Sequence, residues 1–476
     1  MQSTSDLAAY LASAGVKRGD RVTIALPNIP QAIVALYAAE SIGAIVNLVS
    51  PKLGQDSLKE AIGETKVLFL LPNLKKKVKD VSAVKIYCGL TEYGRSRFFF
   101  LLSPFLPSTY TQALGAGKCL PRPQGYGEGD GTSPAFLLHS AGTAGEPKTV
   151  VLSGEALNNL VDDVMTAVRG VTDADPEMGM LAALPLFHGF GLGIGIHLAM
   201  SRIRCLPMPR FSAKKAVSIM KRTRVSVLAG VPSMFRKLSK EERFSGDFIK
   251  NLDLIFCGGD RLGKNVKDAF ESILQKNGCF TPIMEGYGMS ETAGVVTINV
   301  ARPNNSSVGQ PLPGAEIRVR DGEILLRARS MMMGYLESDG RIVCPIEELD
   351  GKEYFPTGDM GFLQDGDLYF LDRKKRTIKI GGNNVFPGQV EQIAAKDPSV
   401  RDAVAVRIVY EDKPAIKLLV VAETDDKKGL TERLNKSIER SLSRYAVPRV
   451  VEYTDRIKKT SFGKSDYRFY EKGSDR

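Results

Sequence analysis

Short aliphatic runs, each bounded by turn residues, constrain the fold of this chain more than any other feature of its sequence. Two helical patterns, LAAYLASAGV and QAIVALYAAESIGA, accompany the first of these runs. Strands that are apolar on both faces and alternate with helices are typical of a parallel sheet covered on both sides. We therefore expect a large α/β domain. The runs are RVTIALP, IVNLVS, KVLFLL, TVVLS, VSVLAGV and LDLIFCGG.

The pattern changes near residue 306. The segments GAEIRVRDGEILLRA and YFPTGDMGFLQDGDLYFLD alternate apolar and polar residues around D-G turns, which is typical of antiparallel strands. Beyond Pro387 a compact segment carries both strand and helix patterns, and the charged stretch Asp372–Arg376 lies between two strand patterns. We therefore expect a domain at 1–371, a hinge at 372–376 and a smaller α+β domain at 377–476.

Length and charge limit the classes of function. A chain of 476 residues is long enough for two to four packed units. Its net charge is +11, but the basic residues are spread along the chain without an aromatic–basic nucleic-acid motif, so we do not expect nucleic acid as a partner. A phosphate-rich ligand, an acidic carrier protein or simple solubility fits this charge equally well.

The sequence also indicates the cellular compartment of the protein. No apolar run approaches the roughly 20 residues that span a bilayer, and the N-terminus lacks the basic-then-apolar layout of a secretory signal. The six cysteines include no C-x-x-C pair, so neither a zinc cluster nor a disulfide framework is expected. We expect a cytoplasmic protein without a transmembrane segment.

The segment LLHSAGTAGEPKTVVLS, residues 137–153, carries the clearest local signal. Glycines let a backbone turn with its amides pointing inward, and hydroxyls and a lysine add donors, so the segment predicts an anion cradle between two strands. It differs from the Walker A pattern because Pro147 replaces the second glycine and removes an amide. A plain hairpin loop is the alternative interpretation. The residues expected to bind phosphate are Ser140, Gly142, Thr143, Gly145 and Lys148.

Further motifs follow in a fixed order, from PLFHGFGLG and GVPSMF through CGGDRL, GYGMSE, VGQPLPGAEIRV and TGD to DRKKRTIKIGGNNVFPGQVE and KKTSFGK. In this order they resemble the signatures of the adenylate-forming superfamily, which includes acyl-CoA synthetases, luciferases and the adenylation domains of peptide synthetases. The resemblance implies a large N-terminal α/β domain with a distorted β-barrel and a small mobile C-terminal α+β domain. It also implies ATP-dependent activation of a carboxylic acid as an acyl-adenylate, followed by transfer to a thiol.

The resemblance implies a nucleotide site as well. Glu291 offers a hard carboxylate for Mg²⁺, although a solvated glutamate in a turn is the alternative. Asp359 resembles the acceptor of the ribose hydroxyls, although an aspartate in such a turn often caps its own backbone. Tyr287 is expected to lie against the purine face. The residues expected to bind adenine or ribose are Gly258, Gly259, Asp260, Tyr287, Gly288, Asp359 and Arg373.

Two lysines resemble the catalytic lysines of the family. Lys464 resembles the one that bridges the carboxylate and the α-phosphate during adenylation, where a cation offsets developing charge. Lys379 resembles the one that faces the site after the small domain rotates about the hinge, at Lys375, for thiol transfer. Gly381 and Gly382 would let a narrow pantetheine arm pass close to the backbone. A surface lysine is the alternative for each of the two.

The substrate acid is expected beside His188, which resembles a wall of the carboxylate site. Gly191 and Gly193 are expected to keep space open for the acyl group. The pocket motifs lack an acidic residue to pair with the ammonium of an amino acid, which favours a fatty acid or another non-amino acid.

The acceptor expected from the resemblance is coenzyme A, with ATP and Mg²⁺ as the other cofactors. Three alternatives stay open: loading of a carrier-protein phosphopantetheine, adenylation without thiol transfer, and an inactive nucleotide-binding homologue. The last of these arises because Ala141 and Ala144 stand where the family usually has hydroxyl residues. Loss of these donors predicts weaker ATP binding.

Overall fold

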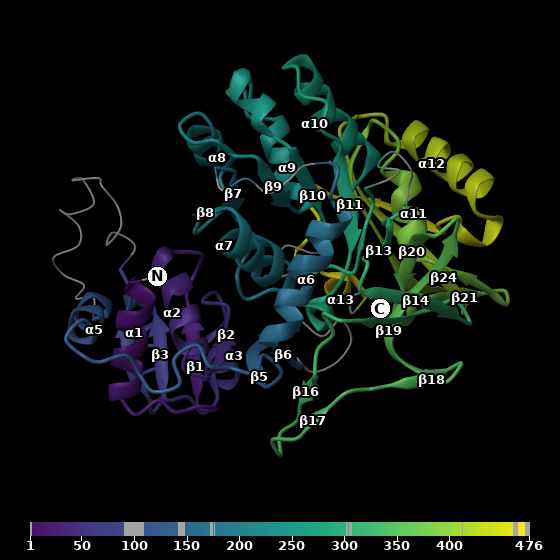
Figure 1. Cartoon of the computed structure of the whole chain (residues 1–476). Coiled ribbons are helices and arrows are strands. Elements are labelled where there is room, and N and C mark those ends of the chain that lie inside the picture. The colour runs from purple at the N-terminus through teal and green to yellow at the C-terminus, as the bar shows by residue number, and fades with distance from the viewer. Residues whose placement is uncertain are drawn as a thin grey trace.

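The computed structural model describes residues 2–89, 109–140, 148–171, 175, 177–300, 303, 307–411, 413–459 and 465–471 (Figure 1). Two units with separate hydrophobic cores follow one another along the chain. The main core of the larger unit runs from Leu7 to Leu368, and that of the smaller unit from Ile378 to Ala446. The expected hinge at 372–376 falls between these two cores.

The first sheet of the larger unit has eight strands in the order β17-β16-β6-β5-β2-β1-β3-β4. Strands β1 to β5 pair in parallel, which confirms the prediction made from the aliphatic runs of β1, β2 and β3. Helices of this part are α1 (Gln2–Ser13), α2 (Pro30–Glu40), α3 (Gln55–Ile62), α5 (Tyr110–Gly117) and α6 (Gly154–Ala167). The strands are β1 (Arg21–Ala25), β2 (Ile45–Leu48), β3 (Val67–Leu70), β4 (Val84–Tyr87), β5 (Pro134–His139), β6 (Thr149–Ser153), β16 (Gly334–Leu336) and β17 (Ile342–Val343).

Strand β6 departs from the expected parallel arrangement. It is the TVVLS run, and it pairs antiparallel with both β5 and β16. The prediction of a parallel strand is therefore wrong at this position. The connection from His139 to Thr149 is too short for the crossover that a parallel pair requires, so the two strands form a hairpin.

The second sheet has seven strands in the order β13-β12-β11-β10-β9-β7-β8. Helices α8, α9 and α10 lie on its outer side, and α6 and η2 lie on the other (Figure 1). The helices are η2 (Gly191–Leu198), α7 (Ala199–Arg202), α8 (Ala213–Met220), α9 (Pro232–Ser239) and α10 (Lys264–Lys276). The strands are β7 (Gly179–Ala182), β8 (Arg204–Pro207), β9 (Val227–Gly230), β10 (Leu254–Cys257), β11 (Ile283–Tyr287), β12 (Thr297–Ile298) and β13 (Gln310–Pro311).

The parallel strands β9, β10 and β11 lie side by side in this sheet. Their carboxyl ends therefore meet at one edge, where ligands bind in open α/β sheets. GVPSMF follows β9, CGGD follows β10 and YGMSE begins at the end of β11. Three motifs that are separate in the sequence thus come together because their strands are neighbours.

A third, antiparallel sheet closes the larger unit, as the alternating pattern predicted. Asp321 and Gly322 have φ angles of 51° and 78°, and Asp365 and Gly366 have 52° and 82°. Positive φ at both central residues is the geometry of tight hairpin turns. The strands are β14 (Ala315–Arg320), β15 (Glu323–Ala328), β18 (Glu347–Leu349), β19 (Lys352–Gln364) and β20 (Asp367–Arg373).

The smaller unit packs helices against a three-stranded sheet in the order β23-β24-β25, which confirms the predicted α+β class. Its hairpin β21–β22 turns at Gly381 and Gly382, whose φ angles are 55° and 83°. The elements are β21 (Ile378–Ile380), β22 (Asn383–Val385), α11 (Pro387–Ala394), β23 (Val400–Tyr410), β24 (Lys413–Ala422), α12 (Lys427–Ser441), β25 (Val450–Tyr453) and α13 (Tyr467–Glu471).

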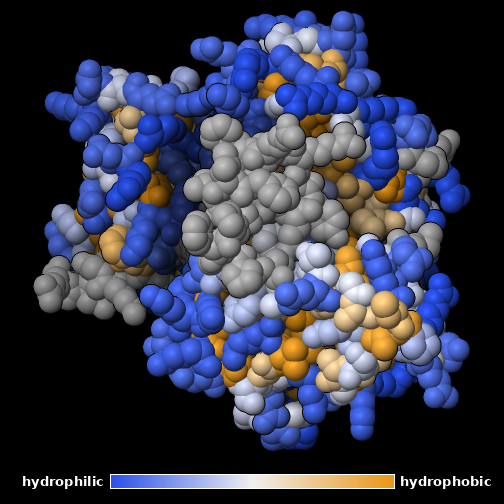
Figure 2. All heavy atoms as spheres, turned by 90° about the vertical axis from the view of Figure 1, so that its left-hand side faces the viewer, coloured by the Kyte–Doolittle hydropathy of each residue, from blue (hydrophilic) through white to orange (hydrophobic). Residues whose placement is uncertain are grey.

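Hydrophilic residues predominate on the face of the molecule in Figure 2, and apolar residues show there in small groups. Within the described parts of the chain, no helix combines the length and the apolar character needed to cross a bilayer.

Candidate active site

The predicted nucleotide residues Tyr287, Asp359 and Arg373 meet at the junction of two sheets. Tyr287 ends β11, while Asp359 and Arg373 face each other across β19 and β20. The Tyr287 hydroxyl donates a hydrogen bond of 2.7 Å to Oδ2 of Asp359, and Nε of Arg373 lies 2.9 Å from Oδ1. The structure therefore unites three side chains that were predicted from three different motifs.

Burial makes this group rigid. The Asp359 side chain is only 1 % exposed, and burial together with this carboxylate raises the pKa of the Tyr287 phenol well above its ordinary value. The Tyr287 ring also packs against Phe370, with 5.8 Å between the ring centroids. A ribose hydroxyl can reach Asp359 only if Tyr287 or Arg373 moves aside.

The segment after β10 is shaped by glycine. Gly258 is buried, and a Cβ atom there would lie 3.3 Å from the ring of Phe190. Gly259 has a φ of 78°, a conformation that side chains rarely adopt. Asp260 is exposed. At Gly288, in the neighbouring motif, a Cβ would lie 2.2 Å from the carbonyl oxygen of Gly294, so only glycine fits there.

The two ends of the predicted phosphate loop are held together. The Ser140 amide donates to the carbonyl of Lys148 at 2.8 Å, and the Lys148 amide donates to the Ser140 hydroxyl at 3.3 Å. Gly142, Thr143 and Gly145 lie outside the described residues. The hairpin of β5 and β6 thus brings Ser140 and Lys148, the two ends of this loop, together beside the first sheet.

Tyr335 connects this loop to the predicted metal ligand, and sequence reasoning missed it. The ammonium of Lys148 lies 4.3 Å from the centroid of the Tyr335 ring, and the Tyr335 hydroxyl donates a 2.9 Å hydrogen bond to Oε1 of Glu291. Burial, and then the Glu291 carboxylate, raise the pKa of Tyr335 above its ordinary value. The motif GYL that contains Tyr335 directly follows the antiparallel hairpin, but nothing in its composition marks a site.

Glu291 suits Mg²⁺ as a single ligand. No group of three or more His, Cys, Asp or Glu side chains in the described ranges could form a complete metal cage. Mg²⁺ commonly binds through one or two carboxylates and completes its shell with substrate phosphates and water. Glu291 beside the ends of the phosphate loop fits that mode.

His188 lies between the end of β7 and the start of helix η2. Its amide donates to the carbonyl of Pro185 at 3.1 Å, and its carbonyl accepts from Leu192 at 2.7 Å. The ring lies beside Phe187, with 5.0 Å between centroids. The local backbone therefore holds His188 in place through the turn that starts η2.

The expectation that Gly191 and Gly193 keep a channel open needs correction. A Cβ at Gly191 would lie 1.9 Å from the carbonyl oxygen of Pro185, and one at Gly193 would lie 2.3 Å from that of Ala293. Neighbouring backbone already fills the space beside both glycines. They allow η2 to pack closely, and a direct role in binding substrate stays a prediction.

Lys379, Gly381 and Gly382, which were predicted for thiol transfer, belong to the β21–β22 hairpin of the smaller unit, and Lys375 was predicted as the hinge and Lys464 for adenylation. Lys379 is exposed on β21, and Lys375 is exposed in the short turn that precedes this strand. A Cβ at Gly381 would lie 2.8 Å from the Tyr445 ring, whereas Gly382 has open space beside it. Lys464 lies outside the described residues.

The chain is similar to enzymes that join carboxylic acids to coenzyme A. The chain is 26 % identical to the long-chain-fatty-acid–CoA ligase of Yersinia pestis, over 96 % of this chain and 86 % of that protein. It is 26 % identical to the 2-succinylbenzoate–CoA ligase of Listeria monocytogenes, over 97 % and 91 %. The solved structure of ATP-bound MatB from Rhodopseudomonas palustris superimposes with a TM-score of 0.81 at 20 % identity, covering 99 % of this chain and 92 % of that one.

Family models match nearly the whole chain. The model for AMP-binding enzymes matches residues 2–336, and the model for the AMP-binding enzyme C-terminal domain matches residues 389–464. These ranges contain most of the motifs that carried the resemblance, whereas TGD and most of DRKKRTIKIGGNNVFPGQVE lie between them. The chain therefore belongs to the AMP-binding enzyme family, within the adenylate-forming superfamily, and is an acid–thiol ligase of the AMP-forming type.

Proposed function

We propose that this enzyme activates a carboxylic acid with Mg²⁺ and ATP, and then transfers the acyl group to coenzyme A. A carboxylate oxygen attacks the α-phosphorus, and the bond to pyrophosphate breaks. The thiol sulfur then attacks the acyl carbonyl, AMP leaves, and the thiol proton passes to solvent. No side chain has to act as a nucleophile, because positioning and charge neutralisation carry such reactions.

One observation carries this proposal. Lys148, Tyr335 and Glu291 form a connected group, and Glu291 comes from the same motif as Tyr287, which bonds to Asp359. A cation at the loop and a carboxylate for Mg²⁺ suit the phosphates, while Tyr287 and Asp359 suit the nucleoside.

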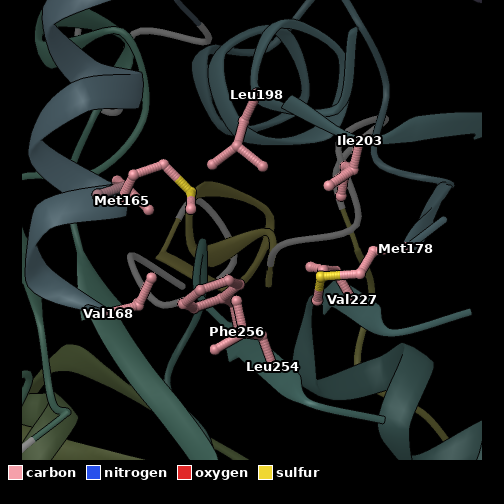
Figure 3. Close-up of a pocket in the computed structure, with 9 residues that line it drawn as sticks. Met165, Val168, Met178, Leu198, Ile203, Val227, Leu254 and Phe256 are labelled. Atoms are coloured by element: carbon pink, nitrogen blue, oxygen red, sulfur yellow. The ribbon is translucent and has the colours of Figure 1, made fainter. Parts of the chain in front are cut away.

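A fatty acid is the acid we propose. An apolar cavity of about 10 Å³ lies between α6, η2 and the second sheet (Figure 3). Such a cavity is too small and too apolar to hold ordered water, so an acyl chain could enter only by displacing flexible side chains such as Met165 and Met178. The residues lining it are Val164, Met165, Val168, Met178, Leu198, Ile203, Val227, Leu254 and Phe256.

The names of the relatives indicate the class of carboxylic acid but do not identify one acid as the substrate. Their names specify long-chain fatty acid, 2-succinylbenzoate and 4-coumarate, and none of these carries an α-ammonium group. Each methylene that the enzyme buries is worth up to about 0.8 kcal/mol, so affinity for straight-chain acids should rise roughly threefold or fourfold per carbon until the available space ends.

Acid-dependent exchange of pyrophosphate into ATP tests the first half-reaction across straight-chain, aromatic and amino acids. Rising exchange with chain length supports a fatty acid, whereas a profile that is flat or best with an aromatic or amino acid contradicts it. Exchange with none of the acids contradicts the activity itself. Thioester formation with coenzyme A, compared with an acyl carrier protein, then identifies the acceptor.

A further inference from the structure

Arg261 crosses the junction between the two units. It follows the Gly258–Asp260 segment at the end of β10 and points toward the last strand of the larger unit, β20, and the first helix of the smaller unit, α11. These two elements lie side by side (Figure 1). Sequence reasoning assigned Arg261 no role, because its hydrogen-bond partners Phe370, Leu371 and Gly388 lie more than 100 residues further along the chain.

The guanidinium of Arg261 binds three backbone carbonyls. It donates to Phe370 at 3.0 Å and to Leu371 at 2.6 Å, both in β20, and to Gly388 in α11 at 2.5 Å. The planar fork of arginine suits several acceptors at once, which a lysine ammonium cannot match in the same geometry. One side chain of the larger unit thus fixes the start of α11 against the end of β20.

Side chains of the hinge segment, residues 372–376, support the same junction. Asp372, 2 % exposed, accepts the Gly388 amide at 2.6 Å and the Arg376 guanidinium at 3.0 Å. Arg376 also bonds to Glu391, in α11, at 2.7 Å, and its guanidinium lies 3.7 Å from the centroid of the Tyr467 ring. These contacts hold α11 to the end of β20 and to the hinge segment, and Arg261 adds a contact to α11 from the end of β10.

Burial strengthens this contact. The Arg261 side chain is largely enclosed, and desolvation lowers the pKa of its guanidinium. A buried cation without its acceptors is costly, so the three carbonyls and the arginine hold each other in one arrangement. Movement of α11 away from β20 would separate Arg261 from Gly388.

We propose that Arg261 is a positioning residue that sets the orientation of the smaller unit and couples it to the Gly258–Asp260 segment. The proposal rests on the proposed function in one respect, since that segment is expected to line the adenine site. Nucleotide that orders this segment would then also order the start of α11, and the first half-reaction would depend on Arg261 more than the second.

Hydrogen–deuterium exchange of the full-length enzyme tests the contact without reference to activity. The variants are Arg261→Met and the more conservative Arg261→Lys. Arg224→Met is the matched control, because Arg224 pairs with Asp175 at 3.0 Å inside the larger unit. The amide hydrogens of peptides that cover Gly388 should exchange at least several-fold faster in Arg261→Met than in the wild type. The increase should be smaller in Arg261→Lys, and Arg224→Met should exchange like the wild type. Unchanged exchange in both Arg261 variants would overturn the proposal, and if Arg261→Met fails to fold, Arg261→Lys decides.

The two half-reactions then test the coupling. Arg261→Met should slow pyrophosphate exchange by about tenfold, since small misplacements of reacting groups are costly, while thioester formation from preformed acyl-adenylate changes little. Arg261→Lys should restore part of the exchange. Equal slowing of both half-reactions, or faster amide exchange without any kinetic change, overturns the positioning role. A wild-type enzyme without either half-reaction contradicts the proposed function instead, and the amide exchange still decides whether Arg261 holds α11.

Discussion

The Tyr287 hydroxyl donates a 2.7 Å hydrogen bond to the Asp359 carboxylate, and this bond joins two motifs that lie 72 residues apart in the sequence. Tyr287 ends a strand of the second sheet, and Asp359 lies in the antiparallel sheet. The bond therefore holds the edges of two sheets together at the candidate nucleotide site. We expect this bond to contribute to stability, and unfolding measurements test that contribution separately from the proposed role in nucleotide binding.

Tyr287→Phe should destabilise the protein by about 1.5–3 kcal/mol, the usual range for a hydrogen bond to a charged group. Urea unfolding measures this change, with Tyr453→Phe as the control, because the Tyr453 hydroxyl donates to the carbonyl of Lys427 at an exposed position and pairs with no charged group among the described residues. The control should change stability by less than about 0.5 kcal/mol. Equal losses in the two variants would mean that the Tyr287–Asp359 bond adds nothing specific.

Glu291→Gln should raise the Mg²⁺ concentration needed for half-maximal activity and lower turnover, because the amide keeps the shape of the carboxylate but not its charge. Tyr335→Phe removes only the hydrogen bond that orients Glu291, so it should shift the Mg²⁺ titration in the same direction by a smaller factor. Titrations of pyrophosphate exchange against Mg²⁺ measure both effects. A titration unchanged by Glu291→Gln would remove Glu291 from the site.

Lys464→Ala should reduce pyrophosphate exchange by on the order of 10²–10³-fold, as loss of one preorganised charge contact typically does. Lys379→Ala should leave pyrophosphate exchange largely intact and slow thioester formation. Lys379 is exposed on the β21–β22 hairpin, and we expect it to act in thiol transfer and not in adenylation. Single-turnover measurements of each half-reaction distinguish the two. Equal damage to both half-reactions by both variants would contradict the separate roles.

The parts of the fold that follow local rules could be predicted from the sequence. The D-G pairs at Asp321 and Asp365 form the expected turns because positive φ is accessible there. Strands β9 and β10 of the second sheet were likewise visible as aliphatic runs, whereas β7, β8 and β11 were not predicted. Hydrophobic periodicity could not show that β6 runs antiparallel to its neighbours, because a short buried strand has the same apolar sequence pattern in a parallel and in an antiparallel sheet.

The candidate site was predictable only where a residue belongs to a recognised motif. Tyr287, Asp359 and Arg373 were named from separate motifs, and the structure supplies the contact that joins them. Tyr335 and Arg261 act through neighbours distant in sequence, Glu291 and Gly388. Such partners are set by how sheets and units pack, which a single sequence does not display.

Histidine burial predicts a pH dependence of stability. Burial, with Arg21 nearby, lowers the pKa of His139 to about 4, while its ring bonds to Asn47 at 2.8 Å. Between about pH 6.5 and 4 the unfolded state therefore binds the extra proton, so the contribution of His139 to stability is present above pH 6.5 and is lost as the pH falls.

His139→Gln removes this titration. The stability advantage of the wild type over His139→Gln should shrink by about 2 kcal/mol between pH 7 and pH 5, at up to about 1.4 kcal/mol per pH unit. Urea unfolding of both proteins at each pH measures the difference, so other titrating groups cancel. His197, whose pKa burial also lowers to about 4, should give a second instance. A difference that stays constant with pH contradicts the prediction.

Two glycines four residues apart in sequence, near the start and in the middle of helix η2, should respond oppositely to alanine. At Gly191 the added Cβ would lie 1.9 Å from the Pro185 carbonyl oxygen, whereas at Gly195 the nearest atom is 3.7 Å away, an ordinary contact. Gly191→Ala should therefore cost about 1–3 kcal/mol through overpacking. Gly195→Ala should be neutral or stabilise by up to about 1 kcal/mol, because alanine restricts the unfolded chain.

Urea unfolding of the two variants measures these changes, and the same preparations can be assayed for the range of acids accepted. If Gly191 serves packing alone, Gly191→Ala should lower stability without changing the relative activities on short and long acids. A variant that is as stable as the wild type and rejects the longest acids would show instead that the Cβ enters an acyl channel, which would restore the role expected from the sequence. Gly195→Ala places an alanine in the same helix without a backbone clash. It therefore controls for the general effect of an alanine in η2, and any further change in Gly191→Ala is due to the contact with Pro185.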